Sequence, residues 1–170
     1  MLNTRLLLTA GVVIGVLASV QAQQAPAKPG MLTGADYGEI QSLYGKYAHY
    51  FDGCADNGAA FARLFTPDGV FVLPNGGAIE GREKLTEFAR CPAGVTRRPT
   101  QHWIASIVIT PAAEGAAGTA YVAQVNTTEP KLATSGNRYE DIFVKGPDGW
   151  AFKKHMVVPT QKSPAPTTPQ

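Results

Sequence analysis

The chain has 170 residues, of which 44% are hydrophobic and 16% charged, and its formal net charge is +2. This length and apolar fraction predict a single globular domain with a hydrophobic core of its own. The charge is close to neutral and the basic residues form no cluster, which argues against a nucleic-acid-binding protein.

The N-terminus carries a pattern typical of exported proteins. After Arg5, residues 6–20 are apolar apart from Thr9 and Ser19, and Val20-Gln21-Ala22 supplies small residues suited to cleavage. This predicts a secretory signal peptide over residues 1–22. The stretch is short for a membrane span, so an uncleaved anchor is the alternative. We expect a periplasmic or secreted protein that has no membrane contact in its mature form.

Composition also sets the limits of the folded domain. Residues 23–30 are rich in Gln, Ala and Pro and predict a flexible leader. Residues 159–170 are rich in Pro and Thr and predict a disordered tail. The folded unit is therefore expected over residues 31–158.

Three helices are predicted in the first half of this unit. Thr33 is a plausible N-cap of the first, and Gly53 is expected to end it. Shorter helices are predicted at residues 57–65 and 81–90, with a turn at 66–69 and a strand at 70–73 between them. The apolar face of the first helix consists of residues at three- and four-residue spacing: Ile40, Leu43, Tyr44, Tyr47 and Phe51.

The second half of the unit has the pattern of strands. Alternating or β-rich runs at residues 102–110, 118–127, 137–145 and 150–157 are separated by turn sequences. Hairpin connections imply an α+β fold with a cone-shaped, curved antiparallel sheet, whose concave face the helices must cover. A cavity between the first helix and the sheet is the expected site.

His102 and Asp52 are the main candidates for chemistry. His102 begins a run in which His102, Ile104, Ser106 and Val108 share one face, and Trp103, Ala105, Ile107 and Ile109 share the other. Asp52 stands where the first helix ends. A histidine that titrates near neutral pH, held by a carboxylate, could perform general acid/base chemistry without a metal or cofactor. The alternatives are a core histidine bound to a carbonyl and a helix-end carboxylate that accepts backbone amides.

Four further residues are candidates for substrate contact. Tyr47 projects toward the expected cavity, where its hydroxyl could donate to a substrate oxygen or it could simply fill the core. Tyr139 and Asp141 share one strand face, and an inward Asp141 would need a partner, such as a cross-strand salt bridge. Trp103 is a candidate for substrate stacking, with packing on the sheet as the alternative.

The remaining polar residues predict neither a metal nor a cofactor. The three histidines are dispersed and have no carboxylates at ligand spacing. Cys54 and Cys91 are the two cysteines. In an oxidising compartment they predict a disulfide worth roughly 3–4 kcal/mol, with two free thiols as the alternative.

Several motifs resemble the SnoaL-like branch of the NTF2-like superfamily. They are Tyr47-Ala48-His49-Tyr50-Phe51-Asp52, the run from Phe61 to Phe71, Gly81-Arg82-Glu83, Gly136-Asn137-Arg138-Tyr139-Glu140-Asp141, and Asp148-Gly149-Trp150-Ala151-Phe152. The resemblance covers the mature domain and implies the cone-shaped fold. Its members include polyketide cyclases, dehydratases, isomerases, cofactorless lyases and scaffolding domains.

Within this superfamily, Thr100-Gln101-His102 is similar to the strand that carries a catalytic histidine in scytalone dehydratases, and Asp52 falls at their aspartate. Tyr139 and Asp141 stand in the region where those enzymes have a second histidine. The resemblance implies a cofactor-independent lyase or dehydratase acting on a small, apolar hydroxylated molecule, for example an aromatic one. His102 would be the acid/base, Asp52 its partner and Tyr47 a donor. A homodimer through the outer sheet face is also implied. A non-catalytic binding domain and an isomerase with Asp52 as base are the alternatives.

Overall fold

The structure, a computed structural model, describes residues 30–129 and 132–160. The predicted signal peptide, most of the leader and most of the tail lie outside these ranges. Within them, no helix is long and apolar enough to cross a membrane. Pro159, expected to open the tail, is the last residue of the final strand.

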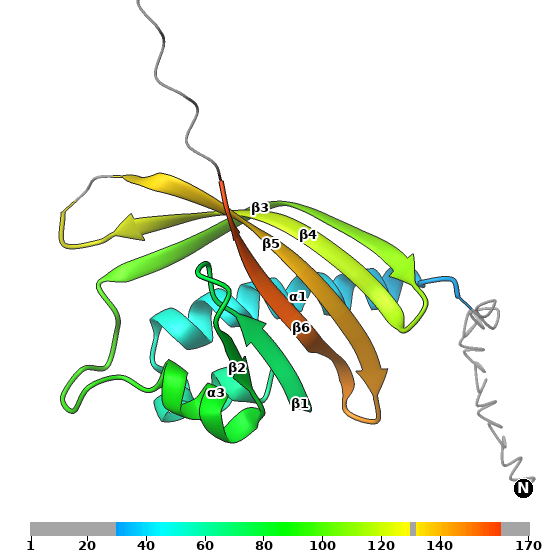
Figure 1. Ribbon diagram of the computed structural model, residues 1–170, viewed down its shortest axis with the longest axis horizontal. Helices are drawn as coiled ribbons and strands as arrows, with labels where there is room; N and C mark the ends of the chain where they lie inside the picture. Colours follow the sequence, from blue (N-terminus) through cyan, green and yellow to red (C-terminus); the bar gives the residue numbers. More distant parts are fainter. Residues whose placement is uncertain (1–29, 130–131, 161–170) are drawn as a thin grey trace, which may run out of the picture.

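Helices precede most of the strands, as Figure 1 shows. The elements in chain order are α1 (Gly34–Asp52), η1 (Ala55–Gly58), α2 (Ala59–Ala62), β1 (Phe65–Val72), β2 (Ala78–Glu80), α3 (Arg82–Ala89), β3 (Thr100–Ala112), β4 (Gly115–Asn126), β5 (Leu132–Gly146) and β6 (Gly149–Pro159). The molecule is therefore α+β, with α1 lying across one face of a curved sheet (Figure 1).

The ends of α1 are those predicted. Thr33 is the N-cap, and its side chain and that of Asp36 bond each other's backbone N–H in a capping box. Asp36 also accepts from Lys145 and from the Trp150 indole, and these hydrogen bonds hold the pKa of its carboxyl well below the usual range. Gly53 caps the other end, where its N–H bonds the carbonyl of His49. Both ends of the helix that carries Asp52 are thus anchored.

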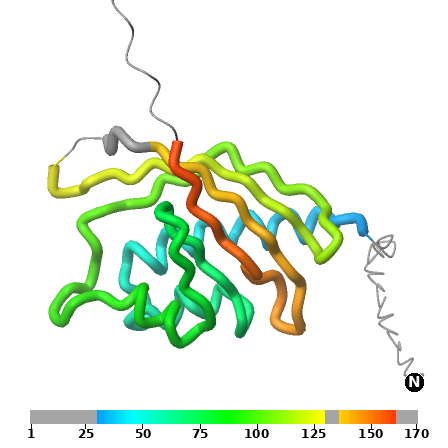
Figure 2. The backbone as a smooth tube through the Cα atoms, in the orientation of Figure 1, coloured from blue at the N-terminus to red at the C-terminus, as the bar shows by residue number. Residues whose placement is uncertain are grey.

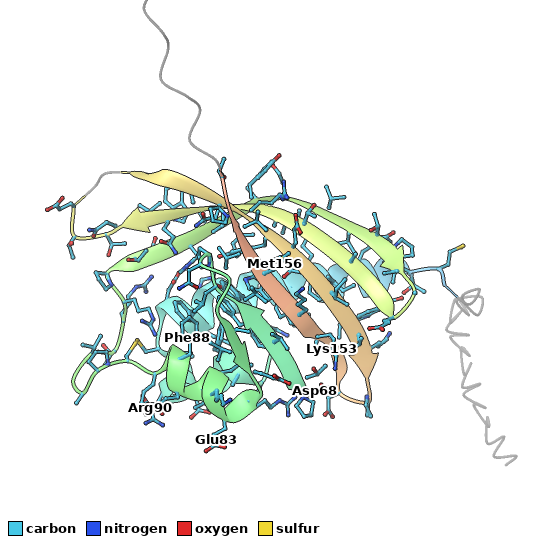
Figure 3. All side chains as sticks on the ribbon, in the orientation of Figure 1. Asp68, Glu83, Phe88, Arg90, Lys153 and Met156 are labelled. Carbon is cyan, nitrogen blue, oxygen red and sulfur yellow. A yellow bond between two sulfur atoms is a disulfide. The ribbon has the colours of Figure 1, made fainter. Side chains whose placement is uncertain are left out.

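The sheet is mixed rather than wholly antiparallel. Its strand order is β2-β1-β6-β5-β4-β3, and β1 runs parallel to β6. Strands β3 to β6 pair antiparallel with their chain neighbours, as the hairpins predict, whereas β1 pairs with a strand from which nearly the whole domain separates it along the chain. The two strands are also joined by an ion pair between Asp68 and Lys153, which lie side by side in Figure 3. Figure 2 traces the curved β3–β6 meander passing over α1.

The segment between α1 and β2 differs from the prediction. The expected helix at 57–65 is broken, because Asp56 and Asn57 have left-handed backbone, and it ends at Ala62. The expected turn at 66–69 lies inside β1, whose pairing with β6 shifts register between Phe65 and Val70. The short edge strand β2 was not predicted.

A bulge in β3 overturns the predicted alternation along that strand. Pairing with β4 shifts register between Ala105 and Val108, and Ser106 has a φ of 52°. His102 and Ile104 face inward as predicted, but beyond the bulge Ile107 and Ile109 pack against the core while Val108 is exposed. One extra residue reverses the faces of all that follow it.

A second irregularity acts in the same way on β6. Its pairing with β5 shifts register between Ile142 and Phe143, so both Phe152 and His155 point into the core. The core between α1 and the sheet is rich in aromatic rings, among them Tyr44, Phe61, Phe65, Phe143 and Phe152. His155 lies wholly within it.

Candidate active site

Asp52 and His102 meet through two contacts. The Nδ1 atom of His102 lies 2.6 Å from Oδ1 of Asp52, and the backbone N–H of His102 donates to Oδ2 at 2.8 Å. Both side chains are buried. Because an ionised carboxylate only accepts hydrogen bonds, the contact places a proton on Nδ1 and leaves Nε2 as the acceptor of a neutral ring. This is the tautomer that a histidine base requires.

Arg98 fixes the helix end that carries Asp52. Its backbone N–H donates to the Asp52 carbonyl at 2.8 Å, and its guanidinium donates to the carbonyls of Phe51 and Ala89. The same guanidinium lies 4.2 Å from the centre of the Phe51 ring. Arg98 thus satisfies C-terminal carbonyls of α1 and α3 at once and ties the two helices together.

The disulfide lies next to these Arg98 contacts in the chain. Cys54, two residues after Asp52, is bonded to Cys91, two residues after the end of α3, with a Cα–Cα distance of 5.8 Å. Cys54 has a left-handed backbone, with φ of 50°. The covalent link and Arg98 therefore hold the same junction between α1 and α3.

His102 lines a cavity of about 120 Å³. Its apolar wall consists of Phe51, Phe71, Leu73, Pro74, Phe88 and Val157. Its polar side consists of Tyr47, His102, Gln124, Asn137 and Tyr139. Phe88, labelled in Figure 3, comes from α3. Gln124 on β4 is directly opposite His102 on β3, and its Nε2 lies 3.0 Å from that of His102. The amide therefore occupies the acceptor nitrogen of His102.

Two tyrosines line the cavity together. The rings of Tyr47 and Tyr139 meet edge-on, with their centres 5.5 Å apart, and the Tyr47 ring meets His102 edge-on at 5.8 Å. Burial, and the charges of Asp141 and Asp52, raise the pKa of Tyr47 and of Tyr139 above the usual value for tyrosine. Both hydroxyls therefore stay protonated and can donate.

Asp141 occupies a different place from the one expected. Its side chain is fully buried and lies outside the cavity lining, so it cannot touch a molecule bound there. Its Oδ2 accepts from the Tyr44 hydroxyl at 2.6 Å, and its Oδ1 lies 2.6 Å from Nδ1 of His155. The structure thus places Asp141 against Tyr44 and His155 in the core and not at the cavity, where substrate contact was expected. The cross-strand pair given as the alternative is what the structure contains.

Trp103 is also remote from the cavity. It lies on the opposite strand face from His102 and is 56% exposed, and it borders a second, polar surface cleft whose lining also includes Asp52 and His102. Strand alternation places it there. Over residues 30–129 and 132–160, no three His, Cys, Asp or Glu side chains are grouped as metal ligands.

Sequence reasoning missed four residues of this region. His155 belongs to a strand that also carries Lys153 and Lys154, and a bulge that the sequence does not reveal turns it inward. Gln124 had a usable signal, since the inward series Ala116, Gly118, Ala120 and Val122 leads to it. For Asn137 and Arg98 the sequence contains no pattern that indicates a place in the site.

The fold and site together define an α+β protein of the NTF2-like, cystatin-like class, with a buried Asp–His pair at its central cavity. The model for the SnoaL-like domain matches residues 33–155, and the chain belongs to that family. No curated protein sequence matches the chain.

Solved structures share the fold at low identity. A protein of unknown function from Mycobacterium tuberculosis has a TM-score of 0.67 and 22% identity, covering 81% of this chain and 84% of its own. A protein from Novosphingobium aromaticivorans named as a candidate scytalone dehydratase has a TM-score of 0.62 and 21% identity, covering 75% and 85%. An NTF2-like protein from the same species has a TM-score of 0.61 and 19% identity, covering 77% and 86%.

Proposed function

We propose that the protein is an exported, cofactor-independent lyase or dehydratase acting on a small, hydroxylated, largely apolar molecule. The observation that carries this proposal is the Asp52–His102 pair, whose histidine lines a cavity together with two protonated tyrosines. General acid/base catalysis needs a base, a group that orients it, and donors to the reacting oxygen. All three are present.

His102 would remove the proton through Nε2, while Asp52 holds the ring and stabilises the imidazolium that forms. In a dehydration, the electron pair of the broken C–H bond forms a double bond, and the hydroxyl leaves as water with that proton. In a carbon–carbon cleavage, His102 takes a hydroxyl proton, a carbonyl forms, and the released carbon is protonated. Either step requires the Gln124 amide to leave Nε2, and a substrate O–H or C–H to replace it.

Tyr47 and Tyr139 would donate to the oxygen that gains negative charge. Their raised pKa values make them hydrogen-bond donors rather than proton donors, because each tyrosinate would be buried near two carboxylates. Such donors act as an oxyanion hole does, by stabilising charge that develops in the transition state.

The cavity restricts the substrate. Its volume of about 120 Å³ is below the roughly 300–1,000 Å³ of pockets for drug-sized ligands. The lining contains no lysine or arginine. We therefore expect a neutral molecule, or the neutral part of one, no larger than about a single substituted ring.

A non-catalytic binding domain is the second candidate, and the Gln124 contact favours it. This amide satisfies the nitrogen that the lyase mechanism needs. An isomerase with Asp52 as base fits the contacts less well. Both carboxylate oxygens of Asp52 are engaged by His102, and Asp52 does not line the cavity.

Turnover of the mature chain, from Gln23 onward, on a panel of aromatic diols and hydroxy-ketones would test the proposal. His102→Ala should abolish turnover, and the exposed His49→Ala should leave it intact. Turnover that survives His102→Ala would rule out the mechanism. Saturable binding of panel members, with turnover of none, would favour the binding domain.

Export and dimerisation belong to the same proposal. The outer face of β3 and β4 exposes Trp103, Val108 and Tyr121, the apolar surface that a homodimer would cover. Light scattering of the mature protein would test the dimer, with Tyr121→Ser expected to yield monomer. Fractionation of cells expressing the full chain would test export.

A further inference from the structure

A second Asp–His pair lies in the core, behind the wall of the cavity. Asp141 on β5 and His155 on β6 are directly opposite in the strand register, and α1 supplies Tyr44 from above. We define these three residues as the buried cluster. The catalytic proposal assigns them no part, and the side chains of the Asp–His pair are 0% exposed.

The buried cluster is costly for a purely structural element. A carboxylate removed from water loses its hydration, and well-packed apolar residues are often at least as stabilising as a buried pair. Within the described residues, Nε2 of His155 has no hydrogen-bond partner. The close contact between His155 and Asp141 is also not aligned as a hydrogen bond. Stability alone thus gives a poor account of the buried cluster.

The surroundings of His155 link the buried cluster to the cavity. Its ring centre is 4.3 Å from that of Tyr139 and 4.8 Å from that of Tyr47. These are the two tyrosines that line the cavity, and their own ring centres are 5.5 Å apart. Tyr47 therefore contacts His102 on one side and His155 on the other.

Charge reinforces this link. Asp141 raises the pKa of both Tyr47 and Tyr139, and it does so more than Asp52 does. Burial contributes most to keeping the cavity tyrosines protonated. Of the two carboxylates, the one in the buried cluster contributes more.

We propose that Asp141, His155 and Tyr44 act as positioning residues, which fix the Tyr47 and Tyr139 side chains and so set the donor side of the cavity. Tyr44 and His155 hold the Asp141 carboxylate from two sides, and the His155 ring supports both tyrosine rings from behind. None of the three touches a bound molecule. The inference rests on the proposed function only where it gives the hydroxyls of Tyr47 and Tyr139 a catalytic role.

The test is NMR of the full mature chain labelled with ¹³Cζ-tyrosine, because the shift of this carbon reports the hydrogen bonding of the hydroxyl. His155→Phe keeps a ring against the tyrosines but removes the contact with Asp141. Tyr44→Phe removes only the hydroxyl that Asp141 accepts from. Each should move the signals of Tyr47 and Tyr139 and leave those of Tyr37 and Tyr121 in place.

Leu85→Ala is the matched control. Leu85 is equally buried but lies on α3 and does not line the cavity, so this variant should destabilise the protein without moving the two signals. Unmoved signals in folded His155→Phe would overturn the proposal. If His155→Phe does not fold, Tyr44→Phe decides by the same criterion.

Turnover separates this proposal from the catalytic one. On any substrate found, His155→Phe should lower kcat by about 10- to 100-fold with little change in KM. If the signals move but no substrate is turned over by the unsubstituted protein, the lyase fails and the positioning role stands. If turnover depends on His102 while the signals stay fixed, the positioning role fails and the lyase stands.

Discussion

The two Asp–His pairs share the same contact distance but lie in different surroundings. In each, Nδ1 of the histidine is 2.6 Å from an aspartate oxygen. The Asp52–His102 pair borders a cavity, and Nε2 of His102 meets a glutamine side chain from an exposed residue. The Asp141–His155 pair is enclosed by aromatic rings. Within the described residues, Nε2 of His155 has no hydrogen-bond partner. Access to a substrate, rather than the pairing itself, distinguishes a reactive pair from a supporting one.

Asp52→Asn is the substitution expected to separate the two pairs most strongly. An amide can donate to Nδ1 and so favours the wrong tautomer of His102, which should lower kcat by about 10²- to 10⁴-fold. The measurement is steady-state turnover at neutral pH. The control is Asp56→Asn, which removes an exposed carboxylate paired with Arg63. This variant should retain full activity. Equal losses in the two variants would contradict the assignment of Asp52.

The loss of stability on substitution should be larger for the Asp141–His155 pair than for the Asp52–His102 pair, the opposite of the order for activity. His155→Ala leaves the buried Asp141 carboxylate without its imidazole partner and should cost about 3–5 kcal/mol of unfolding free energy. His102→Ala, at the edge of a cavity that water can enter, should cost about 1–3 kcal/mol. Urea denaturation of both variants gives the comparison. A larger loss for His102→Ala would show that the cavity pair is the structural one.

Removal of the disulfide should affect mainly the cavity pair. The Cys54→Ser, Cys91→Ser double variant should lose roughly 3–4 kcal/mol of stability, because the unfolded chain is no longer closed into a loop. The link adjoins Asp52 and is remote in sequence from Asp141. In ¹⁵N-histidine NMR, the His102 signals should therefore shift more than those of His155. Larger shifts at His155 would show that the link does not act on the Asp52 junction.

The smallest expected effect concerns the alkaline titration of the buried tyrosines. Their folded pKa values are raised, so as pH rises above about 10 the unfolded state ionises first and stability falls. Asp141→Asn removes a charge that opposes ionisation and should lower the pH of the phenolate transition, followed at 295 nm. Asp52→Asn should lower it less, because its charge contributes less. The opposite ranking would contradict the assigned electrostatics.

Much of the fold could be predicted from the sequence. The caps of α1, the four strands of the meander and the α+β class follow from local patterns and agree with the structure. The parallel β1–β6 contact could not be predicted in this way, because it joins segments more than 80 residues apart in the chain. No local pattern reports which distant strand will lie alongside.

The candidate site divides in the same way. The juxtaposition of Asp52 and His102 could be proposed from a helix end and a strand start, with the resemblance to guide it. Residue type suggested a role for Trp103 and Asp141, but neither lines the cavity: Asp141 is buried in the core, and Trp103 borders a surface cleft on the other side of the Asp52–His102 pair. Gln124 could have been found by extending the alternation of β4 across from His102.

The sequence by itself determined which residues form helices and strands and which of them could carry proton chemistry, because capping, periodicity and side-chain chemistry are local. The tertiary structure decided which faces point inward, because single-residue bulges at Ser106 and near Phe152 reverse the alternation of β3 and β6. Those bulges depend on pairing with neighbouring strands. For that reason only the folded chain brings His155 to Asp141, and the pair to the back of the cavity tyrosines.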